Sequence, residues 1–350
     1  MKICFVISDI ETEAIGTSVI LMKKAYERKH ELYVMNVGDF VFKQDAPMSL
    51  RCSLVNKKFT YKNTEEFWTK VQENSKKKTV ITSNNLDVLF LRNNPTEETD
   101  DRKWAEHSAI AFARMIQQED VIVLNDAFAM SHAYIDKLYY EELPAKIKPN
   151  SLITRNINDL LQFWESVGKQ MVLKPLEGSG GQDVYLIGKD KKNIHQIFET
   201  LISQGYVIAQ EFLPEVSKGD VRVILMNGKV LEEDGKKAVI RRVNKDKDEF
   251  RSNLSLGATA KKTNYTKKMQ HIVEITAPKL IKDGLFFVGL DIVDDKLIEI
   301  NVLSPGGLEY CEEMGLPSFT TTIIKAIERK VKYKTFYKNN ISNKVLATMD

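Results

Sequence analysis

The first third of the chain alternates strand-like and helix-like segments, and this alternation constrains the fold more than any other sequence feature. Residues 2–7 form a short apolar run that predicts a buried strand. Residues 14–29 carry apolar side chains at helical spacing, and residues 30–37 predict a second strand. Because a strand, a helix and a strand in this order pack as parallel strands, we expect an open parallel α/β sheet. The pattern continues to about Asp126, with an expected strand over residues 86–93, a helix over residues 100–117 and a strand over residues 121–126.

The rest of the chain predicts α+β units without strict alternation. Strand-like runs flank a glycine-rich turn within residues 170–188, and another run follows at residues 205–214. Residues 244–263 are polar and basic and predict a long loop, and residues 332–344 predict a solvated, partly ordered basic tail. Helices are expected over residues 158–167, 193–203, 265–282 and 320–332. We therefore expect four parts, at residues 1–126, 127–208, 209–319 and 320–350.

Composition excludes several classes of protein. A net charge of +3 over 350 residues is too small to indicate a nucleic-acid partner. Cys4, Cys52 and Cys311 lie far apart and form no C-x-x-C pair, which indicates a reduced intracellular protein without a structural zinc site. No small-residue cleavage site follows the first strand, and no apolar run approaches the roughly 20 residues that span a bilayer. We expect a cytoplasmic protein with no membrane partner.

The segment GLDIVDDKLIEINVLSPGG, residues 289–307, places polar side chains inside strand-like apolar runs. Asp291, Glu299 and Asn301 interrupt these runs, and a carboxylate in a strand core costs several kcal/mol unless a partner compensates it. Glu299 and Asn301 are two residues apart and therefore share a face of their strand.

The length of the turn decides whether Asp291 joins that face. A two-residue loop at Asp294 and Asp295 would pair Asp291 with Ile298, whereas a three-residue loop over residues 294–296 would pair it with Glu299. The three-residue loop separates polar from apolar side chains cleanly, and we therefore predict it. The opposite, buried face would then carry Leu290, Ile292, Ile298, Ile300 and Val302.

Two carboxylates and an amide oxygen on one face form a set of hard oxygen ligands. Such a set suits Mg²⁺, which takes few protein ligands and bridges to the phosphates of a substrate. The alternative is an exposed sheet face with solvated acids, and the hairpin alone does not decide between the two.

The segment MVLKPLEGSGG, residues 171–181, combines a strand lysine with a glycine-rich turn. Lys174 lies in an apolar strand, and Gly178, Gly180 and Gly181 let backbone N–H groups approach a phosphate. The segment matches neither the P-loop nor G-x-G-x-x-G, and a plain hairpin turn is the alternative. The lysine beside the turn favours nucleotide binding.

Arginines upstream of the hairpin indicate an anionic substrate, because their guanidinium groups bind carboxylates and phosphates through paired hydrogen bonds. Arg222 lies in the strand-like run VRVIL. The alternative interpretation, a solvated basic loop, therefore applies least to Arg222. Solvated basic loops remain the alternative for Arg241 and Lys245. The remaining candidates are Arg242 and Arg251.

Taken in order, these motifs resemble the prokaryotic-type glutathione synthetase branch of the ATP-grasp superfamily. The motifs are EGSGG, AQEFLP, KGDVRVILMNG, EFRSNLSLGA and FVGLDIV with the following EIN and SP. The resemblance extends from about Ile3 to Leu316 and is densest from Ser151 to Pro305. It implies an ATP-grasp fold of a lid and a catalytic subdomain, preceded by the open parallel α/β domain.

The resemblance also implies roles for individual residues. ATP would lie between the two subdomains, with the glycine turn over its phosphates and the 244–263 loop as a cover. Mg²⁺ is the expected ion, and Mn²⁺ is the alternative. The implied positions are Lys137 and Lys174 for the nucleotide, with Gly178, Gly180 and Gly181 in the turn; Gln210, Glu211, Phe212 and Leu213 for adenine; Asp220 for ribose; Asp291, Glu299 and Asn301 for the metal; and Arg222, Arg242, Arg251 and Asn253 for the acceptor carboxylate and phosphoryl group.

The implied activity is an ATP-dependent ligation of γ-glutamylcysteine and glycine through an acyl phosphate, by a cytoplasmic homo-oligomer. The chain departs from the family pattern at residues 303–307, LSPGG, where the family commonly has threonine in place of Leu303 and of a glycine. These positions lie near the expected peptide acceptor. An ATP-grasp ligase with a different acidic peptide or amino-acid acceptor is therefore the alternative, and a nucleotide-binding protein without turnover is less consistent with the complete metal set.

Overall fold

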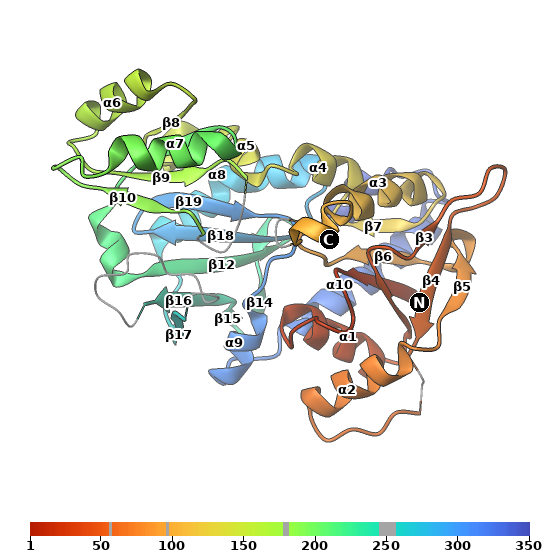
Figure 1. Cartoon of the computed structure of the whole chain (residues 1–350). Helices are drawn as coiled ribbons and strands as arrows, with labels where there is room; N and C mark the ends of the chain where they lie inside the picture. The colour runs from red at the N-terminus through yellow and green to blue at the C-terminus, as the bar shows by residue number, and fades with distance from the viewer. Residues whose placement is uncertain (56–57, 96–97, 178–181, 245–256) are drawn as a thin grey trace.

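The computed structural model describes residues 1–55, 58–95, 98–177, 182–244 and 257–350. These residues form three main sheets of seven, four and six strands, which follow one another along the chain, and a small two-stranded hairpin (Figure 1). The four-stranded sheet and its helices lie at the upper left of the view, above the six-stranded sheet, and the seven-stranded sheet lies at the right. No described helix is long and apolar enough to cross a membrane.

The first sheet confirms the predicted open parallel arrangement. Strand β1 pairs in parallel with β2 and β6, and β6 pairs in parallel with β7. Alternate residues of β1 enter different cores: Phe5 packs in the cluster that contains residues of α1, and Val6 in the cluster that contains residues of α3. The antiparallel strands β3, β4 and β5 extend the sheet beyond what the sequence predicted. The bounds are β1 Lys2–Ile7, α1 Thr17–Glu27, β2 Glu31–Asn36, β3 Phe40–Val41, β4 Ser49–Leu54, α2 Thr64–Asn74, β5 Thr79–Thr82, β6 Val88–Leu91, α3 Ala105–Gln118 and β7 Ile122–Leu124.

The four-stranded sheet forms a separate unit with its own core. Its order is β10-β9-β11-β8, and all of its pairings are antiparallel. Leu160 and Trp164 of α6 and Phe198 and Leu201 of α7 pack in one cluster with residues of the sheet. We call this unit the lid. Two short helices, α4 Ala127–His132 and α5 Asp136–Glu141, precede it; its own bounds are β8 Ser151–Thr154, α6 Ile157–Ser166, β9 Met171–Pro175, β10 Tyr185–Ile187, α7 Ile194–Gln204 and β11 Val207–Glu211.

The six-stranded sheet has the order β17-β16-β12-β18-β19, with β13 paired to β12. Helix α8 covers one face of the sheet, where Met269 and Ile272 join the core cluster that contains Val223 and Leu290. The predicted loop over residues 244–263 is wrong at its end, because residues 259–262 form the edge strand β17; residues 245–256 lie outside the described chain. The bounds are β12 Asp220–Met226, β13 Lys229–Val230, β14 Glu232–Glu233, β15 Lys236–Lys237, β16 Val239–Val243, β17 Thr259–Lys262, α8 Lys267–Asp283, β18 Phe287–Val293, β19 Lys296–Asn301 and α9 Leu308–Glu313.

Residues 332–344 are exposed or half-buried, which confirms the prediction of a solvated tail, but the C-terminus is more ordered than predicted. Helix α10, Thr320–Phe336, continues beyond its predicted end, and α11, Asn343–Thr348, packs back on the protein. The apolar residues Leu346 and Ala347 are buried, which outweighs the polar character of the preceding segment. The side chain of Asn343 accepts a hydrogen bond from the N–H of Val123 and donates one to its carbonyl, both 2.9 Å long. It thereby satisfies backbone groups at the open edge of β7.

A buried asparagine joins the first sheet to the six-stranded sheet. Asn125 follows β7, and its Oδ1 accepts a hydrogen bond from Phe287 N at 2.8 Å. Its Nδ2 donates to the carbonyl of Phe287 at 3.1 Å and to that of Val302 at 2.8 Å. One side chain therefore fixes the start of β18 and the residue after β19 against the end of β7.

A buried lysine generates a prediction about stability and pH. Lys330 of α10 is fully buried, and its Nζ donates to Asn227 Oδ1 at 2.9 Å and to the carbonyl of Met349 at 2.7 Å. Burial lowers its pKa to about 7. Between pH 7 and the usual lysine pKa, the unfolded chain therefore binds one more proton than the folded chain, and a rise in pH stabilises the fold.

Above pH 7, we expect the free energy of unfolding of the wild type to increase with pH relative to that of Lys330→Met. The slope should approach about 1.4 kcal/mol per pH unit. Urea unfolding of both proteins at several pH values between about 7 and 9 measures this slope. Subtracting the value of the variant from that of the wild type removes the contribution of the other titrating groups. A difference that stays constant over this range would contradict the neutral state of Lys330.

Candidate active site

The hairpin of β18 and β19 pairs Asp291 with Glu299, as predicted, but by a different route. The turn has two residues, Asp294 and Asp295, and not three. The pairing shifts by one residue between Asp291 and Ile292, which pairs with Leu297. This β-bulge supplies the extra residue that we had assigned to the turn.

The bulge also corrects the prediction for the buried face. Leu297 is fully buried, whereas Ile298, which we expected there, is only half-buried. Leu290, Ile292, Ile300 and Val302 are buried, as expected. Ile298 instead lines a pocket on the side of Glu299.

The carboxylate of Asp291 lies at the centre of a buried charge cluster. Arg222 stands directly opposite Asp291 on β12, and its Nε and Nη2 donate to the two carboxylate oxygens, with 2.8 Å for Nη2 to Oδ2. Arg242 of β16 reaches Oδ2 at 2.9 Å. Asn301 donates to Oδ2 through its Nδ2 at 3.2 Å. Three of these contacts end on Oδ2, which is therefore fully engaged, whereas Oδ1 accepts only from Arg222 Nε among the described residues and keeps one acceptor position.

Cross-strand register explains why these charges meet. Asp220 and Arg222 are two residues apart on β12 and share a face; Asp220 stands opposite Arg242, which it binds at 2.7 and 2.8 Å. Gly289 leaves room for this arrangement, because a Cβ there would lie 3.0 Å from Cδ of Arg222.

Electrostatics favours the ionised form of the central pair. Burial opposes ionisation of Asp291, but Arg222 and Arg242 outweigh it and hold the pKa of its carboxyl well below the usual range. Burial likewise disfavours the charged form of Arg242, but Asp291 and Asp220 outweigh it and raise its pKa. The cluster therefore keeps two positive guanidinium groups in a nearly dry place, which stabilises them only while their carboxylate partners remain.

Only some of the oxygen atoms of the predicted metal ligands are available to a divalent cation. Glu299 makes no hydrogen bond or ion pair with the described residues, and Asn301 uses its Nδ2 for Asp291, which leaves its Oδ1 available. These oxygens suit Mg²⁺. On Asp291, Oδ1 keeps one acceptor position, whereas Oδ2 would have to lose a contact before it could bind a metal. The described residues contain no cluster of three or more acidic, histidine or cysteine side chains arranged as a metal site.

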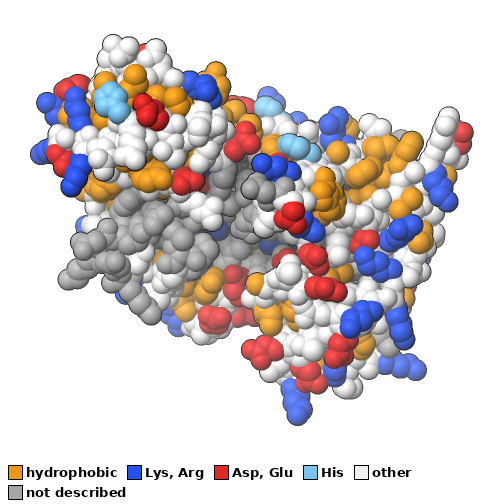
Figure 2. Space-filling view, in the orientation of Figure 1, with side chains coloured by type: hydrophobic (Ala, Val, Ile, Leu, Met, Phe, Trp, Pro, Cys, Tyr) orange, Lys and Arg blue, Asp and Glu red, His pale blue; other side chains and the backbone are white. Residues whose placement is uncertain are grey.

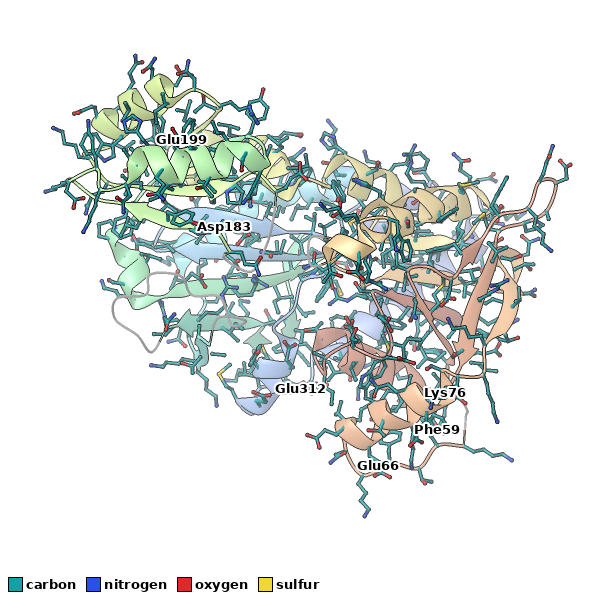
Figure 3. The ribbon with its side chains drawn as sticks, in the orientation of Figure 1. Phe59, Glu66, Lys76, Asp183, Glu199 and Glu312 are labelled. Carbon is teal, nitrogen blue, oxygen red and sulfur yellow. The ribbon has the colours of Figure 1, made fainter. Side chains whose placement is uncertain are left out.

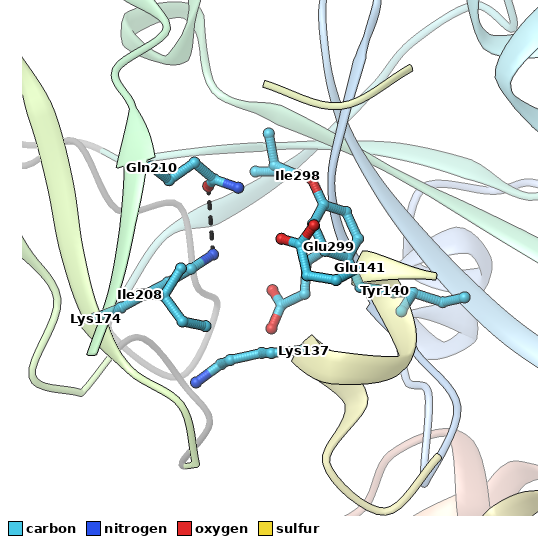
Figure 4. A pocket seen from close by; sticks show the side chains of 9 residues that line it. Lys137, Tyr140, Glu141, Lys174, Ile208, Gln210, Ile298 and Glu299 are labelled. Atoms are coloured by element: carbon cyan, nitrogen blue, oxygen red, sulfur yellow. Dashed lines mark hydrogen bonds between the residues drawn. The ribbon is translucent and has the colours of Figure 1, made fainter. Parts of the chain in front are cut away.

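A pocket between the lid and β19 brings together four of the predicted residues. Lys174 of β9, Gln210 of β11, Lys137 of α5 and Glu299 of β19 line it (Figure 4). Tyr140, Glu141, Ile208, Ile298 and Ile300 complete the lining.

Hydrogen bonds fix several of these groups. Lys174 Nζ donates to Gln210 Oε1 at 3.3 Å, and Lys137 Nζ donates to the carbonyl of Pro175 at 2.8 Å. Gln210 is 6 % exposed, and its Nε2, which lies beside the Tyr140 hydroxyl, makes no hydrogen bond of ordinary geometry with the described residues. A buried amide donor without a partner costs about 1–3 kcal/mol. The pocket is therefore suited to a ligand with a hydrogen-bond acceptor beside Gln210.

Tyr140 and Glu141 were missed by the sequence analysis. They lie three and four residues after Lys137 on α5, which places all three on one helix face. That spacing is visible in the sequence, but no apolar periodicity marked this short helix. Glu141 is bound by Lys148 Nζ at 2.5 Å and by the Ser151 hydroxyl at 2.8 Å.

The other predicted positions lie elsewhere. Glu211 ends β11, where its Oε2 accepts from Nδ2 of Asn150 at 2.9 Å, and Phe212 and Leu213 follow it without lining the pocket. Asp220, expected near ribose, is 4 % exposed and bound to Arg242, so its carboxylate is already engaged. Gly178, Gly180, Gly181, Arg251 and Asn253 lie outside the described residues.

The segment after β19 packs against the first sheet. Arg92, at the end of β6, is 3 % exposed, and its Nη2 donates to the carbonyl of Pro305 at 2.9 Å. Burial lowers the pKa of Arg92 to about 10, which leaves it charged at neutral pH. The arginine directly after a strand-like run was the only sequence signal for it. Figure 2 shows acidic side chains beside the junction between the lid and the rest of the molecule.

Sequence comparison identifies both halves of the chain. The profile of the prokaryotic glutathione synthetase N-terminal domain matches residues 1–130, and that of the ATP-grasp domain of the same enzyme matches residues 136–315. A glutathione synthetase of Buchnera aphidicola subsp. Acyrthosiphon pisum is 29% identical over 335 residues, which cover 95% of this chain and 98% of that one. One of Vibrio parahaemolyticus is 28% identical over 318 residues, covering 90% and 93%.

Structural comparison supports the same fold. The D-cycloserine synthetase DcsG superimposes with a TM-score of 0.58 at 13% identity, covering 93% of this chain and 99% of that one. The macrocyclase MdnC of Microcystis aeruginosa, bound to a precursor peptide, has a TM-score of 0.59 at 12% identity, with the same coverage. The lid and the six-stranded sheet thus form an ATP-grasp fold, and the chain belongs to the prokaryotic glutathione synthetase family.

Proposed function

We propose that this protein is an ATP-dependent ligase that joins γ-glutamylcysteine to glycine. The observation that carries the proposal is the match of both family domains along the chain, together with a pocket at the junction of lid and catalytic sheet. Relatives that match nearly their whole length carry the name glutathione synthetase.

The reaction consists of two substitutions. A carboxylate oxygen at the cysteinyl end of the dipeptide attacks the γ-phosphorus of ATP, and ADP leaves. The nitrogen of glycine then attacks the carbon of the resulting acyl phosphate, phosphate leaves with the bonding electrons, and the nitrogen loses a proton. Both partners of the first step are anions, so catalysis depends on positive charge that offsets their repulsion.

Within this scheme, the pocket residues bind the nucleotide. Lys137 and Lys174 place two positive charges beside the junction and attract phosphates. Gln210 offers its unpartnered Nε2 to a ring nitrogen of the adenine base. No side-chain nucleophile is needed, and burial raises the pKa values of Cys4, Cys52 and Cys311.

The three contacts on Oδ2 of Asp291 give the arginines a second role. While Asp291 holds Arg222 and Arg242, their charges are neutralised inside the protein. Arrival of an anionic substrate offers the guanidinium groups new oxygen partners, and one of them can exchange Asp291 for the substrate carboxylate or phosphoryl group. This exchange would release an oxygen of Asp291.

Glu299, Asn301 and the released Asp291 would then hold Mg²⁺, or Mn²⁺ as the alternative. The ion would supply charge that neutralises the phosphates of ATP. A cytoplasmic location remains a prediction from the sequence composition, and a homo-oligomeric state remains a prediction from the family resemblance.

The substrate proposal is tested by ADP release from the purified protein with ATP and Mg²⁺. We expect release that depends on both γ-glutamylcysteine and glycine, because the acyl phosphate turns over only when an amine intercepts it. A panel of other acidic peptides and amino acids serves as the comparison. ATP binding without ADP release from the first pair, while another acceptor supports release, would favour the alternative acceptor.

Two neighbouring acids should respond differently to loss of charge. Asp291→Asn leaves two buried arginines with too little negative charge, so the free energy of unfolding should fall by about 3–5 kcal/mol and turnover should be lost. Glu299→Gln removes a carboxylate that no described residue binds, so stability should change by less than about 0.5 kcal/mol while turnover falls at least about 100-fold.

Asp294→Asn is the matched control, because Asp294 is exposed in the same hairpin and pairs only with Lys268 among the contacts described, at 2.7 Å. Thermal unfolding and ADP release measure both effects, and the control should leave both unchanged. Full turnover in Glu299→Gln would refute its place in the metal site.

A further inference from the structure

The segment Ser304–Gly307 is held by backbone hydrogen bonds to the start of α1. Thr17 Oγ1 accepts from the N–H groups of Gly307 and Leu308, both at 3.1 Å. The hydroxyl of Ser304 donates to the carbonyl of Arg92 at 2.9 Å. These contacts fix the segment against two elements of the first sheet domain.

Two buried arginines bind consecutive carbonyl groups of this segment. Arg92 binds that of Pro305, and Arg222 donates through Nη1 to that of Gly306 at 3.2 Å. Because Arg222 also binds Asp291, the segment adjoins the charge cluster of the proposed reaction centre. A substrate carboxylate bound by Arg222 would therefore lie near Gly306.

Glu309, the second residue of α9, uses one carboxylate oxygen and leaves the other available. Its Oε2 accepts from the Thr17 hydroxyl at 2.5 Å and from Gly307 N at 3.2 Å. Its Oε1 faces two glycines: a Cβ on Gly16 or on Gly306 would lie 3.8 Å from it. No described residue donates a hydrogen bond to Oε1. The missing side chains leave room for a small group beside a negatively charged oxygen.

We propose that Glu309 is a specificity-determining residue that binds the α-ammonium group at the γ-glutamyl end of the acceptor through its Oε1. The proposal rests on the proposed function. A small cation with N–H donors matches both the charge of Oε1 and the space left by Gly16 and Gly306. The amine of glycine fits less well, because a carboxylate beside it would favour its protonated form, which cannot attack the acyl phosphate.

The test compares γ-glutamylcysteine with its desamino analogue, glutarylcysteine, in the wild type and in Glu309→Gln. The wild type should prefer γ-glutamylcysteine by about 10- to 100-fold in kcat/KM, the value of one charge-assisted hydrogen bond. Glu309→Gln should erase this preference by raising KM for γ-glutamylcysteine while kcat changes little. Its amide oxygen can still accept from Thr17 and Gly307, so a purely structural role would leave the preference intact.

Two further variants keep the test decisive. Glu312→Gln is the control on the same helix: Glu312 is also half-buried, and its Oε1 accepts from the Ser318 hydroxyl at 2.7 Å (Figure 3). It should keep the wild-type preference. Gly306→Thr leaves Glu309 in place but adds a hydroxyl that can occupy Oε1, so it should lower the preference even if Glu309→Gln folds poorly.

The results of these measurements distinguish a failure of the role of Glu309 from a failure of the proposed function. Turnover of γ-glutamylcysteine with an unchanged preference in Glu309→Gln and in Gly306→Thr would overturn the role of Glu309 alone. Absence of turnover with that dipeptide in the wild type would overturn the proposed function and with it the identity of the ammonium ligand.

Discussion

The pairing of Asp291 with two arginines is the interaction on which the site depends. Arg222 of β12 stands directly opposite Asp291 of β18, and Arg242 of β16 stands opposite Asp220, two residues before Arg222, so the register of these three strands places the charges. The fully buried carboxylate of Asp291 is stable only because Arg222 and Arg242 bind it, and the arginines are stable for the same reason. A site built in this way is ready to exchange one ion pair for another when an anionic substrate enters.

Contacts of the same charge cluster link it to elements of all three sheets. Arg222 extends from Asp291 to the carbonyl of Gly306, and that segment is held in turn by Thr17 and Arg92 of the first sheet domain. Asn125 fixes the ends of β18 and β19 from the other side. The pocket between the lid and β19, which we propose as the nucleotide site, adjoins the cluster through Glu299, which lies opposite Asp291 in the hairpin. Acceptor and nucleotide would therefore approach the same carboxylates from different domains.

The sequence predicted the elements and the pairing of Asp291 with Glu299, because apolar periodicity records which face is buried. The sequence did not predict the turn correctly, because a three-residue turn and a two-residue turn with a β-bulge both place Asp291 opposite Glu299. The two arrangements differ in which residue is buried, and the structure buries Leu297 in place of Ile298. Tyr140, Glu141 and Arg92 were missed because short helices and strand ends carry no periodic signal. The tail at residues 332–344 is solvated, as predicted, but α11 was missed because its two buried apolar residues, Leu346 and Ala347, are too few to form a periodic pattern.

The most direct test of this account is a crystal structure with ADP, Mg²⁺ and γ-glutamylcysteine. We expect the nucleotide between β9, β11 and β19, with Lys137 and Lys174 at its phosphates, and the metal on Glu299 and Asn301. Asp291 should have lost at least one arginine contact and should bind the metal with the released oxygen. A bound metal with all four contacts of Asp291 intact would contradict the exchange.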